Sequence, residues 1–194
     1  MGSEVATREG RRSVVLPVVV LVAAMWVAEA LDWLLPVDAD SWGIRSRTLG
    51  GLVGIPLSPF LHNGFGHLLA NTIPLLVLGI IVSWRAASRF WSVVVTIVLV
   101  GGSVVWLFGS SGTVTIGASG LVFGLLTYLI TAGALTRHWL DVLVAVGVLL
   151  MYGGLLLGAV PFMVPAGVSW LGHLGGALGG VVAAFFYSRK EVPS

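Results

Sequence analysis

Long stretches of this chain contain no charged residue. Residues 13–28, 48–84, 90–136 and 142–188 lack Asp, Glu, Lys and Arg, and the last two stretches are each 47 residues long. A helix that crosses a bilayer needs about 20 apolar residues, so each of these two stretches has room for two spans. Charged residues make up 9% of the chain, whereas a soluble domain carries roughly 25%. The sequence therefore predicts an integral membrane protein and excludes a soluble globular domain.

Turn residues divide the two longest apolar stretches, at 109–113 (GSSGT) and at 161–167. Two further apolar runs start near Ser13 and Gly66. We therefore expect an all-α bundle of six transmembrane helices, at residues 13–35, 65–83, 90–108, 117–135, 139–160 and 169–187. Residues 1–12 are then a polar tail, residues 13–188 the six-span domain, and residues 189–194 a second tail.

The basic residues predict the orientation of this bundle. Only Arg45 and Arg47 fall on one side of a six-span arrangement, in the loop 37–64. The other eight are Arg8, Arg11, Arg12, Arg85, Arg89, Arg137, Arg189 and Lys190, and all of them fall on the opposite side. Short cytoplasmic loops collect Lys and Arg. We therefore expect both termini, and both tails, to be cytoplasmic, and the loop 37–64 to lie outside.

The N-terminal segment also has features of a cleavable secretory signal. Arg11 and Arg12 precede an apolar run that reaches the A-x-A sequence at 28–30. The run continues to Leu35, however, and is long enough to cross a membrane. We therefore favour a first transmembrane helix over a signal that is removed.

Composition excludes several classes of function. The chain has no cysteine, so it contains no disulfide, no thiolate metal site and no cysteine nucleophile. Its net charge of +2 is too small and too scattered for a nucleic-acid-binding surface. We expect the lipid bilayer to be a partner, and no nucleic acid, metal or cofactor.

Three groups of polar residues lie inside predicted spans, where polar side chains are costly and are functional candidates. They are HLLAN (67–71), GASG (117–120) and HLGGALGG (173–180). At 1.5 Å per helical residue, His67, Ser119 and His173 each lie roughly 24 to 27 Å from the basic residue that ends their span. Three groups at one height on three helices favour a shared site over independent packing roles.

The first two groups both offer hydrogen-bond donors. His67 and Asn71 are four residues apart and share one face of the second span. Ser119 opens the fourth span, where unpaired backbone N–H groups and the positive end of the helix dipole favour a developing anion. Taken alone, GASG is a weak signal, because it lacks the fifth-position glycine of the hydrolase nucleophile elbow.

The third group combines a histidine with small residues. Gly172, Gly176 and Gly180 recur every four residues and form a smooth seam along the sixth span. By itself such a seam is more typical of helix packing than of a site. It would nevertheless let this helix close on another and bring His173 within hydrogen-bonding reach of Ser119, the arrangement that activates a serine nucleophile.

These three motifs, in this order on the second, fourth and sixth of six spans, resemble those of the rhomboid family of intramembrane serine proteases. The resemblance runs from about Trp42 to Tyr187. It implies that Ser119 is the nucleophile and that His173 is the general base and then the acid. It further implies an oxyanion hole made by His67, Asn71 and the Ser119 backbone N–H. Supporting positions implied by the resemblance are Phe123, Gly117, Gly120, Gly172, Gly176 and Gly180, with Phe123 as the aromatic on which the histidine packs.

Other segments match the family less closely. His62 matches a histidine of the family's first loop that is more structural than chemical. Residues 161–163 (PFM) resemble the loop that caps the site, with the fifth span as a lateral gate. The family often has a Trp-Arg pair in its first loop, whereas this chain has Trp42 and Arg45 separated by two residues.

The resemblance implies hydrolysis of peptide bonds in or near transmembrane segments of membrane-anchored proteins. Water must reach such a site, so we expect a polar cavity open to the outer face of the membrane, which we expect to be a prokaryotic plasma membrane. The alternatives are a non-catalytic scaffold or chaperone-like protein of the same fold, and a transporter. A transporter would place polar residues near the midplane, often within inverted repeats, and neither feature is seen in the sequence.

Glu29 is the one acidic residue clearly within a span, and the same rise per residue places it at the height of His173. It could orient His173 as a third catalytic member. We favour instead an anchor for the first loop, held by Arg45 or Arg47, because the family resemblance implies a dyad without an acid.

Overall fold

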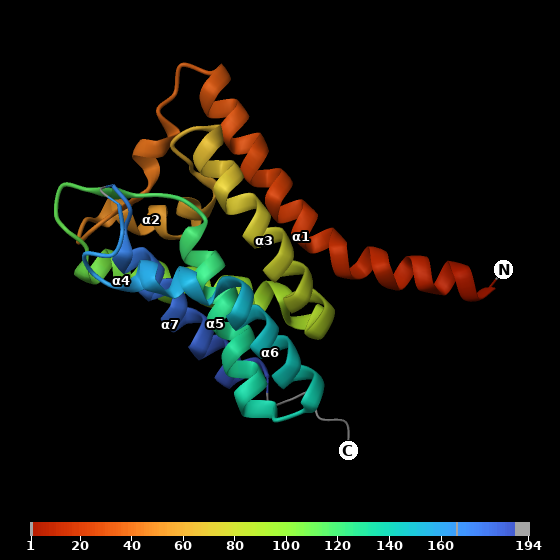
Figure 1. Cartoon of the computed structure of the whole chain (residues 1–194). Coiled ribbons are helices and arrows are strands. Elements are labelled where there is room, and N and C mark those ends of the chain that lie inside the picture. Colours follow the sequence, from red (N-terminus) through yellow and green to blue (C-terminus); the bar gives the residue numbers. More distant parts are fainter. Residues whose placement is uncertain (1, 166, 189–194) are drawn as a thin grey trace.

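Six apolar helices make up most of the molecule (Figure 1). The computed structural model describes residues 2–165 and 167–188, with side chains from Val14 onward. The six helices long enough to cross a membrane are α1 (Gly2–Leu34), α3 (Phe65–Arg85), α4 (Phe90–Phe108), α5 (Ser119–Thr136), α6 (Trp139–Tyr152) with its 3₁₀ continuation η4 (Gly153–Ala159), and α7 (Trp170–Tyr187). The expected six-span helical fold is confirmed, and the chain is an integral, multi-pass membrane protein.

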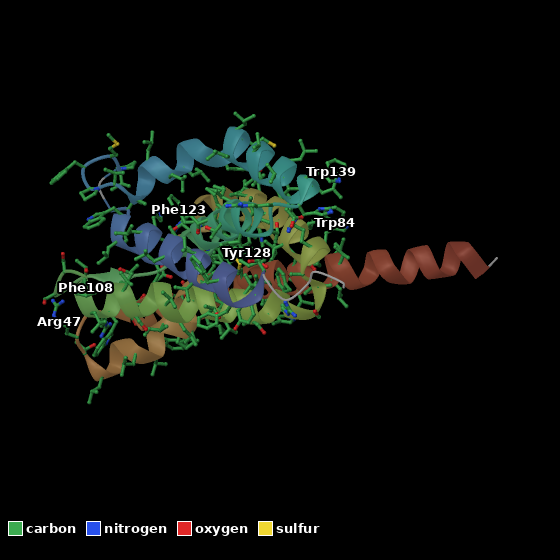
Figure 2. All side chains as sticks on the ribbon, turned by 90° about the horizontal axis from the view of Figure 1, so that it is seen from below. Arg47, Trp84, Phe108, Phe123, Tyr128 and Trp139 are labelled. Atoms are coloured by element: carbon green, nitrogen blue, oxygen red, sulfur yellow. The ribbon has the colours of Figure 1, made fainter. Side chains whose placement is uncertain are left out.

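The ends of the bundle carry different side chains. Figure 2 shows Trp84 and Trp139 near one end and Arg47 and Phe108 near the other. Residues 2–12, expected to be a tail, continue α1 as helix beyond the rest of the bundle (Figure 1). The expected tail at 189–194 lies outside the described residues. The cytoplasmic placement of both termini stays a prediction.

The segment 37–64, expected to be a loop, is largely structured. It contains η1 (Ala39–Trp42), β1 (Ile44–Arg45), α2 (Leu49–Leu57) and η2 (Ser58–Phe60); the remaining short elements are η3 (Ala87–Arg89) and β2 (Val114–Thr115). α2 is apolar but too short to span, and it packs on α4 with Ile55 against Gly102. Strands β1 and β2 pair antiparallel, with Ile44 opposite Thr115. This pairing ties the first loop to the turn that precedes α5.

α7 packs against two helices through glycines on two of its faces. A Cβ at Gly176 would lie 2.6 Å from the Gly120 carbonyl carbon on α5, and one at Gly175 would lie 2.8 Å from Gly101 O on α4. Because these neighbours are backbone atoms, no side chain can move aside to make room. The expected seam of every fourth residue therefore lies against α5, and a second seam, beginning at Gly175, lies against α4.

α6 is the least enclosed of the six spans. Of 18 consecutive residues in the α6 and η4 segment, 11% are buried, compared with 56% of those in α5. Its first turn is held firmly, because Asp141 forms an ion pair with Arg85 of α3 and accepts a hydrogen bond from Thr136 at the end of α5. Figure 2 shows α6 along one edge of the bundle. The helix is thus anchored at its beginning and more loosely packed toward η4.

Candidate active site

Ser119 and His173 meet at the beginnings of two helices. Ser119 is the first residue of α5, and His173 lies in the first turn of α7, where Ser169 caps the helix by accepting a hydrogen bond from the Gly172 N–H. The glycine packing of α5 on α7 brings the two side chains together. His173 Nε2 lies 2.9 Å from Ser119 Oγ, which is hydrogen-bonding distance.

The other ring nitrogen of His173 fixes the tautomer. His173 Nδ1 lies 2.9 Å from the backbone carbonyl oxygen of Gly158, in η4. A carbonyl oxygen only accepts hydrogen bonds, so this contact requires the proton on Nδ1, and in the neutral ring Nε2 then accepts from the Ser119 hydroxyl. The imidazole also stacks on Phe123, with ring centroids 4.1 Å apart and planes 10° apart. His173 is therefore held on both nitrogens and on one face.

The loop before Ser119 packs against the predicted oxyanion residues. Gly117 has φ +105°, and a Cβ there would lie 2.8 Å from His67 Cε1 and 4.0 Å from Asn71 Nδ2. The missing side chain lets the backbone approach both donors, and the positive φ favours glycine. Asn71 Nδ2 donates one hydrogen bond to His67 O within α3. The side-chain amide carries a second N–H.

His62 contacts the backbone of the loop that precedes Ser119. Its Nε2 accepts a hydrogen bond of 3.3 Å from the Ala118 N–H, and Ser58 O accepts one of 2.8 Å from the Gly117 N–H. His62 is 1% exposed, and burial, together with the nearby His67 imidazole, lowers the pKa of His62 to about 4. The ring therefore stays neutral at physiological pH and can accept the Ala118 hydrogen. These contacts make His62 part of the support for the Ser119 loop.

A cavity of about 470 Å³ opens beside Ser119. Its wall includes the polar residues Ser58, Asn63, His67, Thr115, Ser119 and Ser169, together with glycines of α4, α5 and α7. The cavity is large enough to admit water molecules. Gly167, Val168 and Ser169 line it from the loop before α7, whereas Phe162 is fully exposed. Residues 167–169, rather than the expected 161–163, therefore border the site.

Glu29 lies away from the His173 ring nitrogens. It is 5% exposed and its carboxylate interacts with the Gly64 backbone at the start of α3. Arg47, one of its expected partners, instead donates to Leu107 O and Gly109 O at the end of α4. Among the described residues the ion pair is that of Arg85 with Asp141. The expected anchoring of Glu29 by an arginine is therefore wrong, and Gly158 O occupies the position that a third catalytic acid would take.

Gly158 and Ser58 are contacts that sequence reasoning missed. Both act through their backbone carbonyls, and a carbonyl is present at every position. Gly158 stands in an apolar run with glycines at 153 and 154, so nothing in the pattern distinguishes it. Only the fold of η4 against α7 reveals the contact.

The fold is a six-span helical membrane bundle in which Ser119 and His173 lie within hydrogen-bonding distance. A sequence model of the rhomboid domain matches residues 50–190. The uncharacterized protein Rv1337 of Mycobacterium tuberculosis is 43% identical over 180 residues, which cover 90% of this chain and 75% of the relative. The uncharacterized protein ML1171 of Mycobacterium leprae is 42% identical over 180 residues, covering 90% and 71%. This chain belongs to the rhomboid family.

Proposed function

We propose that this protein is an intramembrane serine protease that cleaves membrane-anchored proteins in or near their transmembrane segments. The observation that carries the proposal is the 2.9 Å contact of Ser119 Oγ with His173 Nε2, in a ring whose Nδ1 hydrogen is already engaged. This arrangement leaves Nε2 as the acceptor for the serine proton. It is the geometry of a nucleophile with its general base.

In the proposed reaction Ser119 Oγ attacks the carbonyl carbon of the scissile peptide bond while His173 Nε2 takes the hydroxyl proton. The tetrahedral intermediate collapses when His173 returns that proton to the leaving amine, which gives an acyl-enzyme. A water molecule, deprotonated by His173, then attacks the ester carbon. As the ester bond breaks, His173 returns the proton to Ser119 Oγ, and the carboxylic acid product leaves. The cavity beside Ser119 supplies a path for this water.

The oxyanion of the intermediate needs donors on the side of Ser119 opposite the base. His67, Asn71 and the Ser119 backbone N–H are the groups we assign to it. Their proximity to Gly117 and the position of Ser119 at a helix N-terminus support this assignment, because the first N–H groups of a helix have no partner within it. A substrate helix has its own amides already paired, so the segment to be cleaved has to unwind before it enters.

A fluorophosphonate probe tests the nucleophile directly. It forms a phosphonyl ester with an activated serine oxygen and releases fluoride, so the full chain in detergent should be labelled at Ser119. Ser119→Ala should abolish both labelling and cleavage of a membrane-anchored reporter, a fall of about 10⁶ in kcat. His173→Ala should also abolish cleavage. Ser103→Ala, at an exposed serine of α4, is the matched control and should retain both. Cleavage by Ser119→Ala would refute Ser119 as the nucleophile, whereas a wild type that neither reacts with the probe nor cleaves the reporter would favour a scaffold role.

The two asparagines of the chain test the oxyanion hole. Asn71→Ala should lower kcat about 10²- to 10³-fold, the usual effect of losing one oxyanion donor, while still labelling at Ser119. Asn63 also lines the cavity but is not assigned a donor role, so Asn63→Ala should keep kcat within about threefold of wild type. Near-normal turnover in Asn71→Ala and in His67→Ala would remove both residues from the mechanism.

We also propose that the site faces the outside of a bacterial plasma membrane, as the basic residues indicate. Because the chain lacks cysteine, single cysteines can report the two faces. A cysteine at Ser41 should react with an impermeant thiol reagent added to intact cells, and one at the exposed His138 should react only after lysis. The opposite pattern would reverse the orientation.

A further inference from the structure

His173 has a hydrogen-bond partner on Nδ1, but that partner is not an acid. In a Ser-His-Asp triad a buried carboxylate holds the imidazole in the correct tautomer. Here the backbone carbonyl of Gly158 takes that place at 2.9 Å. We propose that the Gly158 carbonyl is the positioning group of His173, and that the dyad is competent only while η4 is docked against α7. This inference rests on the proposed protease function.

The fold of η4 explains why this carbonyl is available. The 3₁₀ helix ends at Ala159, and the next backbone hydrogen bond, from the Val160 N–H, goes to Leu157 O. The last carbonyls of a helix have no partner within it. Gly158 O is therefore left to accept a hydrogen bond from another element, and the His173 ring is the donor it meets.

A side chain at this position would be tightly placed. A Cβ at residue 158 would lie 3.0 Å from Phe123 Cζ and 3.2 Å from His173 Nδ1. Both distances are shorter than ordinary van der Waals contact, and both atoms belong to rings that stack on each other. A side chain here therefore requires η4 or the two rings to shift by a few tenths of an ångström, and we expect the shift to disturb the ring whose orientation η4 sets. Gly154, one turn earlier, has nothing within 4 Å of its Cβ position.

The packing of α6 makes this contact conditional. Its first turn is held by the Asp141 contacts with Arg85 and Thr136. Of 18 consecutive residues in the α6 and η4 segment, however, only 11% are buried. Displacement of η4 would remove the acceptor from Nδ1. The proton could then sit on Nε2 instead, and a protonated Nε2 in a neutral ring cannot accept the Ser119 hydrogen. The looser end of the bundle thus controls the tautomer of the base.

The first experiment measures the tautomer in the wild-type protein. The full chain, labelled with ¹⁵N-histidine and held in detergent, has only four imidazoles, and His173→Gln identifies the signals of His173. We expect His173 to be neutral with its proton on Nδ1 near pH 8. A proton on Nε2 would overturn the proposal, whatever the activity of the enzyme. The tautomer is read from the wild-type protein, and the variant serves only to assign its signals.

The second experiment compares Gly158→Ala with its matched control Gly154→Ala. We expect Gly158→Ala to lower kcat at least tenfold with KM changed less than about twofold, because the ring is misoriented while the substrate path is intact. Its His173 signals should show both tautomers, whereas Gly154→Ala should match wild type in kcat and tautomer. Equal kcat and tautomer in the two variants would overturn the proposal. Wild-type protein that is not labelled at Ser119 would refute the protease function, while the tautomer would still test the contact.

Discussion

α6 and α7 both pack against α5, but α7 lies close to α5 over a longer stretch. α7 meets α5 along its length through Gly176 and Gly180, whose Cβ positions are occupied by α5 backbone atoms. α6 approaches closely near its beginning, where a Cβ at Gly133 would lie 2.6 Å from Ala145 Cβ, and most of its remaining surface is exposed. The pair α5 and α7 is rigid because backbone contacts backbone, whereas the far end of α6 rests on side chains.

This difference divides the candidate site into two parts. The rigid pair sets the separation of Ser119 from His173, because it fixes where both helices begin. The looser α6 supplies only one atom to the site, the Gly158 carbonyl oxygen, which bears on the tautomer of the base. The spacing of the two side chains therefore depends on the α5–α7 packing, whereas the contact on His173 Nδ1 depends on the position of η4.

The largest expected effect comes from adding one methyl group to the rigid pair. Gly176→Ala places a Cβ over the Gly120 backbone, and overpacking of this kind costs about 3 kcal/mol. The melting temperature in detergent should fall sharply, and activity with it. Gly147→Ala, in the middle of α6, has nothing within 4 Å of its Cβ position and should be neutral or slightly stabilising, by up to about 1 kcal/mol. Equal melting temperatures for Gly176→Ala and Gly147→Ala would show that α7 is packed no more tightly than α6.

The loop on the Ser119 side should respond to pH through His62. The pKa of His62 is lowered to about 4 in the folded protein from an ordinary value near 6.5, so the unfolded chain binds the proton more readily between these values. The free energy of unfolding should therefore fall by up to about 3 kcal/mol as the pH drops from 6.5 to 4. Thermal unfolding in detergent over this range measures it.

Asp40 changes the pH dependence of stability in the opposite direction, so its contribution has to be separated from that of His62. Burial, together with nearby carboxylates such as that of Asp32, raises the pKa of Asp40 to about 6, so its contribution to stability is greatest at low pH and is lost as the pH rises through 6. The His62→Gln variant keeps Asp40 and loses only the His62 titration. The difference in the free energy of unfolding between variant and wild type should therefore change with pH as the His62 titration predicts. Parallel pH profiles would show that His62 is not buried as described.

A smaller effect is expected where α6 is anchored. Asp141→Asn weakens the contacts with Arg85 and Thr136, and a charged hydrogen bond contributes about 1.5–3 kcal/mol. The protein should melt earlier, but Ser119 should still react with a small fluorophosphonate, because that reaction needs no movement of α6. Asp38→Asn, at an exposed aspartate, is the control and should melt as wild type does. An unchanged melting temperature in Asp141→Asn would show that this end of α6 is loose as well.

The smallest expected effect is that of Glu29→Gln. Glu29 supports the Gly64 backbone, so the substitution should cost about 1 kcal/mol of stability and leave kcat within about threefold. If Glu29 were instead the third member of a triad, kcat would fall by about 10⁴, as when the orienting acid is replaced by its amide. Kinetics and melting measured on the same preparation distinguish the two roles.

Hydropathy and motif spacing were sufficient to predict the spans and the residues proposed for the site. The six helices appear close to their expected bounds, because crossing a bilayer demands about 20 apolar residues in a row. His67, Ser119 and His173 could be placed at one height because helical rise is constant. The stack of Phe123 on His173 agrees with the pairing implied by the family resemblance.

Contacts made by backbone atoms, and contacts between distant segments, could be decided only by the tertiary structure. Gly158 O and Ser58 O leave no mark on the sequence, because carbonyls occur at every residue. Gly175 and Gly179 are visible in the motif at 173–180, but only the packing shows that they face α4. The partner expected for Glu29 was wrong for a related reason. Charge complementarity does not tell which arginine is near, and Arg47 is held by α4 carbonyls that only the folded chain brings within its reach.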